Sequence, residues 1–215
     1  MKTIVAVLIV ILVIFSGGVF WYKSEQNKKQ EVKLKEFSEV FVRDYSAFYG
    51  NKDAKVVLVE FFDPACGTCA QFYPLVKDFL TKYNGKIKVA YRYAPFHKNS
   101  NFIVAILEAL RLQDKFDEAL ATLFKYNDAW VIDHESNVQL AMDILLEIIP
   151  DIDLQKLYDD LQSPEIQRRV EQDYKDLTAL GVNKTPGFFV NGKPLETFGY
   201  ENLVYLIESE IKQNY

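Results

Sequence analysis

The segment FFDPACGTCAQFYP, residues 61–74, contains the only two cysteines of this 215-residue chain, Cys66 and Cys69. Gly67 and Thr68 separate them. A Cys-x-x-Cys pair has three ordinary uses: half of a zinc site, a structural disulfide, or a pair of redox-active thiols. The residues on either side of the pair distinguish these uses.

A zinc site and a structural disulfide both fit the sequence poorly. Structural zinc takes four Cys or His ligands, whereas the chain adds to the pair only His97 and His134, which lie far apart and lack the usual spacing. A disulfide that closes a four-residue loop contributes only about 2 kcal/mol in the chain-entropy treatment. We therefore favour the redox use.

The cysteine pair lies between a predicted strand and a predicted helix. Residues 54–62, AKVVLVEFF, form a nearly continuous apolar run, which predicts a strand buried on both faces. A helical pattern then runs from Cys66 to about Tyr83. Free N–H groups and the helix dipole at the start of a helix stabilise an anion, so we expect a thiolate with a lowered pKa at Cys66. Cys69, one turn further on, would be the second, shielded thiol.

The remaining pattern predicts two half-domains around a helical block. Residues 86–96 predict a second strand, so the first half reads as a βαβ unit with parallel strands. Residues 97–161 have helical periodicity and no clear strand signal. A helix starting at Ser163-Pro164 and ending at Gly181 follows, then a hairpin over 187–198 around Asn191-Gly192, then a closing amphipathic helix.

Two motifs together resemble the DsbA-like branch of the thioredoxin superfamily. They are VEFFDPACGTCAQFYP and, far downstream, GVNKTPGFFVNGKPL, and the resemblance covers about residues 50–215. It implies an α/β thioredoxin fold with an inserted helical domain, and the apolar N-terminus described below adds a transmembrane or signal helix before it. The expected divisions are a signal-anchor or signal peptide (1–22), a helical stalk (23–45), the first half of the thioredoxin fold (46–97), the inserted helical domain (98–162) and the second half (163–215).

The resemblance also implies roles for individual residues. Cys66 corresponds to the nucleophilic cysteine, Cys69 to the buried one, and Pro186 to a cis-proline facing the pair. Thr185 would offer backbone groups to an extended substrate strand. Glu60 corresponds to a buried acid that helps Cys69 exchange its proton, and burial should raise its pKa.

The sequence departs from the family pattern between the cysteines. Strong oxidases of the family often carry Pro-His there, but Gly67 and Thr68 provide no imidazolium. We place both residues with Thr185 in the substrate-binding part of the site and expect Cys66 to be less acidic than in the strongest oxidases. The two histidines, His97 and His134, are interpreted as surface or capping residues.

The N-terminus predicts a membrane-directed segment. Residues 3–22 contain twenty uncharged residues, enough for a helix of about 30 Å, the thickness of a bilayer core. A signal-anchor is favoured over a cleavable signal peptide because the apolar run continues to Tyr22. The lysines after residue 22 conflict with the positive-inside rule, yet export signals begin in this way, so we place the domain outside the cytoplasm. Residues 23–45 suit a stalk, a docking helix or a homodimer contact, and a solvated helical linker fits them equally well.

The expected function is that of a DsbA-like thiol–disulfide oxidoreductase that catalyses disulfide formation in exported proteins through the CGTC pair. The substrates would be unfolded or cysteine-containing exported proteins, and a membrane redox partner would recycle the pair. No cofactor or metal is expected beyond the Cys66–Cys69 pair. The mild net charge of −5 argues against nucleic-acid binding. Oxidase, isomerase and reductase activity all stay open, as does a non-enzymatic anchored chaperone or adaptor.

Overall fold

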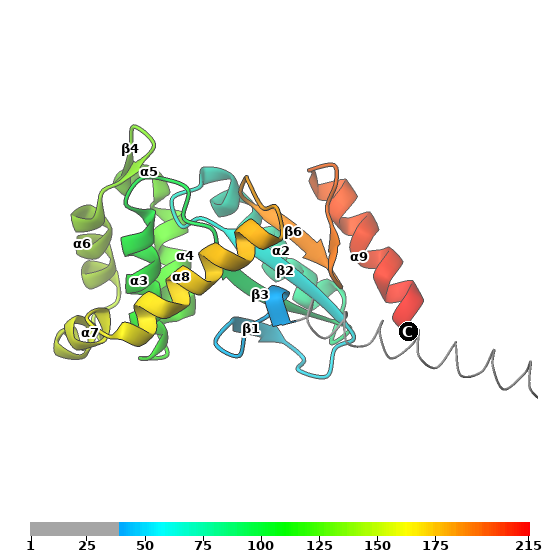
Figure 1. The fold of residues 1–215 in the computed structure, drawn as a ribbon, viewed down its shortest axis with the longest axis horizontal. Coiled ribbons are helices and arrows are strands. Elements are labelled where there is room, and N and C mark those ends of the chain that lie inside the picture. The colour runs from blue at the N-terminus through cyan, green and yellow to red at the C-terminus, as the bar shows by residue number, and fades with distance from the viewer. Residues whose placement is uncertain (1–38) are drawn as a thin grey trace, which may run out of the picture. The chain divides into compact units, whose positions relative to one another are not determined.

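The computed structural model describes residues 39–215 (Figure 1). The predicted anchor or signal peptide (1–22) and most of the predicted stalk and dimer contact (23–45) lie outside the described residues. None of the helices within residues 39–215 is long and apolar enough to cross a bilayer.

A five-stranded mixed sheet forms the centre of the fold, in the order β1-β3-β2-β6-β7. Strands β2 and β3 are parallel, as the βαβ pattern predicts, and the other neighbouring pairs are antiparallel. Strand β2 is the central strand, and all of its residues except Val57 are buried. The strands are β1 (Ala47–Gly50), β2 (Val56–Phe62), β3 (Ile87–Tyr93), β6 (Gly187–Val190) and β7 (Lys193–Pro194).

Helices cover both faces of the sheet (Figure 1). Tyr91 and Arg92 of β3 point to opposite faces because side chains alternate along a strand. On the first face, Tyr91 packs against Tyr73 of α2 (Gly67–Lys82), with ring centroids 6.2 Å apart. On the second, the buried Arg92 binds Asp173 of α8 (Pro164–Ala179) at 2.9 Å. The closing helix α9 (Tyr200–Asn214) also contacts β2 and β6.

The helical insertion follows β3, and two interruptions divide the block of residues 97–161 that the sequence predicts to be helical. Residues 101–126 form two helices rather than one stretch, because Asp114 has a positive φ of 58°. A short hairpin, β4 (Val131–Ile132) and β5 (Glu135–Ser136), was not predicted; Asp133 and His134 form its turn with φ of 50° and 62°. The helices are α3 (Ser100–Arg111), α4 (Phe116–Lys125), α5 (Asn127–Trp130), α6 (Val138–Ile148) and α7 (Leu154–Leu161).

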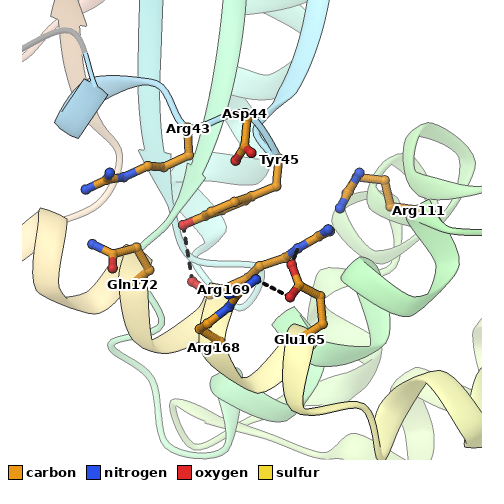
Figure 2. A pocket seen from close by; sticks show the side chains of 8 residues that line it. All are labelled: Arg43, Asp44, Tyr45, Arg111, Glu165, Arg168, Arg169 and Gln172. Atoms are coloured by element: carbon orange, nitrogen blue, oxygen red, sulfur yellow. Dashed lines mark hydrogen bonds and ion pairs between the residues drawn. The ribbon is translucent and has the colours of Figure 1, made fainter. Parts of the chain in front are cut away.

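The helix predicted for residues 23–45 is wrong at its C-terminal end. Residues 39–41 are helical, but residues 42–45 are not, and β1 follows at once. The side chains of this segment bind α8: Arg43 makes two hydrogen bonds to Asp176, at 2.8 and 2.6 Å, and the Tyr45 hydroxyl donates to Asp173 at 2.7 Å. Residues 44–46 form a turn before β1, and Figure 2 shows the Tyr45 hydroxyl directed at Arg169 of α8, whose carbonyl oxygen lies 3.5 Å from it.

Buried ion pairs join the sheet to the helices. The fully buried Arg92 contacts both Asp173 and Asp176, and the backbone N–H of Tyr93 donates to Asp173. The Tyr93 hydroxyl donates to the buried Glu108 of α3 at 2.9 Å. Unpaired buried charges are strongly unfavourable, so this mutual pairing fixes α3 and α8 against the end of β3.

Candidate active site

Cys66 occupies the N-cap of α2, as the sequence predicts. The helix begins at Gly67, and the Cys66 sulfur accepts a hydrogen bond from the backbone N–H of Cys69 at 3.3 Å. Cys66 is 7% exposed and Cys69 is fully buried, while Gly67 and Thr68 between them are exposed. Both thiols are free in the structure. An incoming sulfur can therefore approach Cys66 but not Cys69.

The two thiols differ strongly in acidity. The pKa of Cys66 is lowered to about 6, mainly by the hydrogen bond with the Cys69 thiol, which outweighs the opposing effect of burial. The side chain of Thr185 and the backbone N–H groups of Cys69 and Thr68 lower it further. Burial raises the pKa of Cys69 well above its ordinary value, and the bond to Cys66 and the charge of Glu60 add to this rise. At neutral pH the pair therefore holds one thiolate, on Cys66.

The loop before β6 brings Thr185 and Pro186 to the cysteine pair. The Thr185–Pro186 peptide bond is cis. The Thr185 carbonyl oxygen lies 3.5 Å from the Cys66 sulfur and accepts a hydrogen bond from Cys66 when that thiol is protonated. Strand β6 pairs with β2, with Gly187 opposite Phe61, so the loop lies at the end of β2 that leads to the pair.

Glu60 lies inside the sheet behind the cysteines. It is 1% exposed, and its Oε2 atom has no hydrogen-bond partner. Burial raises its pKa to about 8, with a smaller contribution from the charge of Cys66. At neutral pH Glu60 is therefore mostly protonated, and when it ionises its charge raises the pKa of Cys69.

Asp63 and His97 lie beside the loop that carries the cysteines, whereas from the sequence His97 was interpreted as a surface or capping residue and Asp63 was not selected. The buried Asp63 carboxylate accepts a 2.8 Å hydrogen bond from His97 Nδ1, and the His97 side chain is only 23% exposed. The Asp63 carbonyl accepts the backbone N–H of Cys66 at 3.0 Å. The signal was available: each residue closely follows one of two strands predicted to be parallel neighbours.

The helical insertion also contacts the loop that carries the cysteines. Asn127, the first residue of α5, is 9% exposed and donates from Nδ2 to the Pro64 carbonyl at 3.4 Å. A β-carbon placed at Gly67 would lie 3.7 Å from Asn127 Oδ1, an ordinary contact distance. The insertion therefore supports the loop before α2 as well as covering the sheet.

Comparison with known proteins agrees with this geometry. The sequence model of the thioredoxin family, described as "Thioredoxin", matches residues 43–209. The chain is 29% identical to a protein of Bacillus anthracis named "Probable disulfide bond formation protein D", with 97% of this chain and 93% of the relative covered.

Solved structures show the same fold. BdbD from Bacillus subtilis, in its oxidised form, superimposes with a TM-score of 0.67 at 26% identity, covering 80% of this chain and 95% of BdbD. The thiol-disulfide exchange protein alpha-DsbA2 from Wolbachia pipientis gives a TM-score of 0.68 at 19% identity, covering 89% and 98%. The chain thus belongs to the thioredoxin family, as an oxidoreductase of its DsbA-like branch.

Proposed function

We propose that the protein forms disulfide bonds in exported proteins, using the Cys66–Cys69 pair as the oxidant. The observation that carries this proposal is the difference between the thiols: Cys66 is partly accessible with a lowered pKa, whereas Cys69 is buried with a raised one. A stabilised thiolate stabilises the reduced pair, and a pair whose reduced form is stabilised is an oxidant. The name of the Bacillus anthracis relative supports the same direction.

The proposed reaction starts from the Cys66–Cys69 disulfide. A substrate thiolate attacks the Cys66 sulfur, the S–S bond breaks, and Cys69 leaves with the electron pair. Glu60, protonated at neutral pH, supplies a proton to Cys69 as it leaves. A second substrate thiolate then attacks the substrate sulfur of the mixed disulfide and releases Cys66 as a thiolate, so two electrons pass from the substrate to the pair.

The exposed residues around Cys66 would bind the substrate. Gly67 and Thr68 are exposed, and the backbone of Thr185 beside the cis-Pro186 lies within reach of a sulfur bound to Cys66. An extended peptide can pair with such a backbone segment as it would with a strand edge. The substrate class we propose is therefore an unfolded, cysteine-containing chain.

The cellular setting follows from the sequence and is part of the proposal. The domain would act outside the cytoplasm, held by residues 1–22 or released after their cleavage. A membrane redox partner would reoxidise the pair, because each turnover leaves Cys66 and Cys69 reduced. Residues 23–45 would serve as the stalk or as a homodimer contact.

The proposal can be tested with two cysteine variants and with one equilibrium measurement. Cys66→Ser should abolish exchange, and Cys69→Ser should accumulate mixed disulfides between Cys66 and substrate. Equilibration of the wild-type pair with glutathione gives its reduction potential: a value well above the glutathione poise supports an oxidase, and one well below it indicates a reductase. Full activity of Cys66→Ser would refute the redox role. Polypeptide binding that persists without both cysteines, with no exchange by the wild type, would favour the chaperone or adaptor.

A further inference from the structure

The ends of two parallel strands bring a second charged group to the cysteine pair. Phe62 is opposite Tyr93 in the pairing of β2 with β3, and the N–H of Ala94 donates to the Phe62 carbonyl at 2.8 Å. The loops that follow these strands carry Asp63 and His97. Their proximity is therefore fixed by the sheet, independently of the residues between the cysteines.

The Asp63 carboxylate holds both loops in place. Its Oδ1 accepts the N–H of Ala65 at 2.8 Å and the hydroxyl of Ser100. Its Oδ2 accepts the N–H of Phe96 at 2.7 Å, and both the N–H and the Nδ1 of His97 at 2.8 Å. Five donors on one buried carboxylate spread its charge and leave the His97 ring little freedom to rotate.

Asp63 links His97 to the cysteine loop, because its carboxylate contacts the His97 ring at 2.8 Å and its carbonyl accepts the backbone N–H of Cys66 at 3.0 Å. The pKa of His97 is raised, first by the hydrogen bond to Asp63 and further by the charges of Asp63 and Cys66, against the effect of burial. The other charged or titratable neighbours are His134, whose ring stacks on His97 at 6.5 Å, and the exposed Lys98–Glu135 ion pair, which carries one charge of each sign. Of the two cations on this loop, only His97 has a buried partner, because Lys98 is exposed and paired with the exposed Glu135 side chain.

We propose that His97, fixed by Asp63, is a positioning residue of the redox site, and that its imidazolium stabilises the Cys66 thiolate of the reduced pair. It thereby supplies, from the loop after β3, the positive charge that Gly67 and Thr68 do not provide. The inference rests on the proposed redox role of Cys66. No proton is transferred to or from His97 during exchange: Cys69 takes the proton, Cys66 stays a thiolate, and the imidazolium remains beside it.

Three variants separate the charge of His97 from its structural bond. His97→Gln keeps a hydrogen-bond donor for Asp63 but removes the positive charge, whereas His97→Lys keeps a positive charge. His134→Gln is the matched control, because it makes the same substitution in the ring that stacks on His97. Absorbance of the thiolate at 240 nm gives the Cys66 pKa, and equilibration with glutathione gives the potential. Thermal unfolding of each variant checks that the fold is retained.

We expect His97→Gln to raise the Cys66 pKa by about one unit, from its value of about 6, and His97→Lys to restore it in part. At pH 7 a change of this size lowers the equilibrium constant for oxidation of glutathione about fivefold, which is about 20 mV for a two-electron couple. His134→Gln should leave both quantities unchanged. The difference between His97→Gln and the wild type should shrink above the pH at which His97 loses its proton.

The possible failures are distinguishable. If the wild type shows no thiolate titration and no exchange with glutathione, the proposed function fails. If the wild type titrates and exchanges but His97→Gln matches it in both quantities, the inference about His97 is overturned. If His97→Gln does not fold, the rate at which Cys66 of the wild type is alkylated is measured as a function of pH instead. A second inflection in this rate profile, from the titration of His97, supports the inference. A profile with a single inflection overturns it.

Discussion

Replacing Glu60 with glutamine should remove one opposing contribution to the pH dependence of the reduced protein's stability, the loss that a buried carboxyl causes as the pH rises. Glu60 is buried in the sheet, and its pKa of about 8 compares with an ordinary value of 4.5. Between these two values the unfolded chain releases the proton while the folded protein keeps it. Glu60 therefore contributes a loss of native-state stability as the pH rises from about 4.5 to about 8, and this loss is complete only above the folded-state pKa. The lowered pKa of Cys66 acts in the opposite sense above pH 6 in wild type and variant alike, so the difference between their two curves isolates Glu60.

The size of the effect follows from the two pKa values. At pH 7 the buried carboxyl destabilises the folded protein by about 3 kcal/mol, and between pH 5 and pH 8 its contribution changes by about 3–4 kcal/mol. For a domain of this size, 3 kcal/mol corresponds to about 6–12 °C in Tm. Glu60→Gln leaves a buried amide that has its own desolvation cost of about 1–3 kcal/mol, so the pH dependence is a cleaner measure than the absolute gain.

The assay is denaturant unfolding of the reduced protein at several pH values from 5 to 8. The wild type should lose stability relative to Glu60→Gln as the pH rises, by the amount given above. Glu196→Gln, which removes an exposed carboxylate, should follow the wild-type curve. Parallel curves for wild type and Glu60→Gln would refute the reasoning, because they would mean that Glu60 is ionised in the native protein with nearly its ordinary pKa.

Three further predictions concern other parts of the molecule. The rate at which iodoacetamide alkylates Cys66 in the reduced protein should rise with a midpoint near pH 6; a midpoint near the ordinary thiol pKa would contradict the hydrogen-bonded N-cap. Asp173→Ala leaves the fully buried Arg92 with one fewer partner and should cost about 3–5 kcal/mol in denaturant unfolding, and a loss below 1 kcal/mol would contradict the buried pairing. Asn191 has a φ of 48° and accepts the Val57 N–H at 2.8 Å, so Asn191→Gly should cost less than Asn191→Ala in the same assay; the reverse order would contradict the turn geometry.

Local patterns predicted the elements nearest the cysteines, and pairings distant in sequence account for what was missed. The apolar run of β2 and the helix start at Cys66 are readable from neighbouring residues alone. Strand β1 is only four residues long, alternates between half-buried and exposed positions, and pairs only with β3, so its own sequence is a weak signal. The cis bond at Pro186 was expected from family resemblance, since spacing by itself does not predict it.

The contact between His97 and Asp63 shows how a pairing is missed when side chains are judged one at a time. A lone histidine after a strand is an ordinary surface or capping residue, which is how the sequence was interpreted. The parallel register of β2 and β3, also predicted from the sequence, places the residues after both strands at one edge of the sheet. Combining the two predictions would have placed His97 beside Asp63, one loop away from Cys66.

The separation of the two thiol pKa values has a source on each side of the pair. The free N–H groups at the start of α2 would lower the pKa of a cysteine placed there. Only Cys66 occupies that position, because Cys69 lies one turn inside the helix and is fully buried. Glu60, behind the pair, raises the pKa of Cys69 when ionised and can protonate it when neutral. A cation in front of the pair, as proposed for His97, acts in the opposite sense on Cys66. Because a lower pKa makes a thiolate a better leaving group, the mixed disulfide would release the substrate sulfur from Cys66 readily, whereas Cys69 stays protonated and does not compete. This arrangement favours completion of substrate oxidation over return of the disulfide to the enzyme.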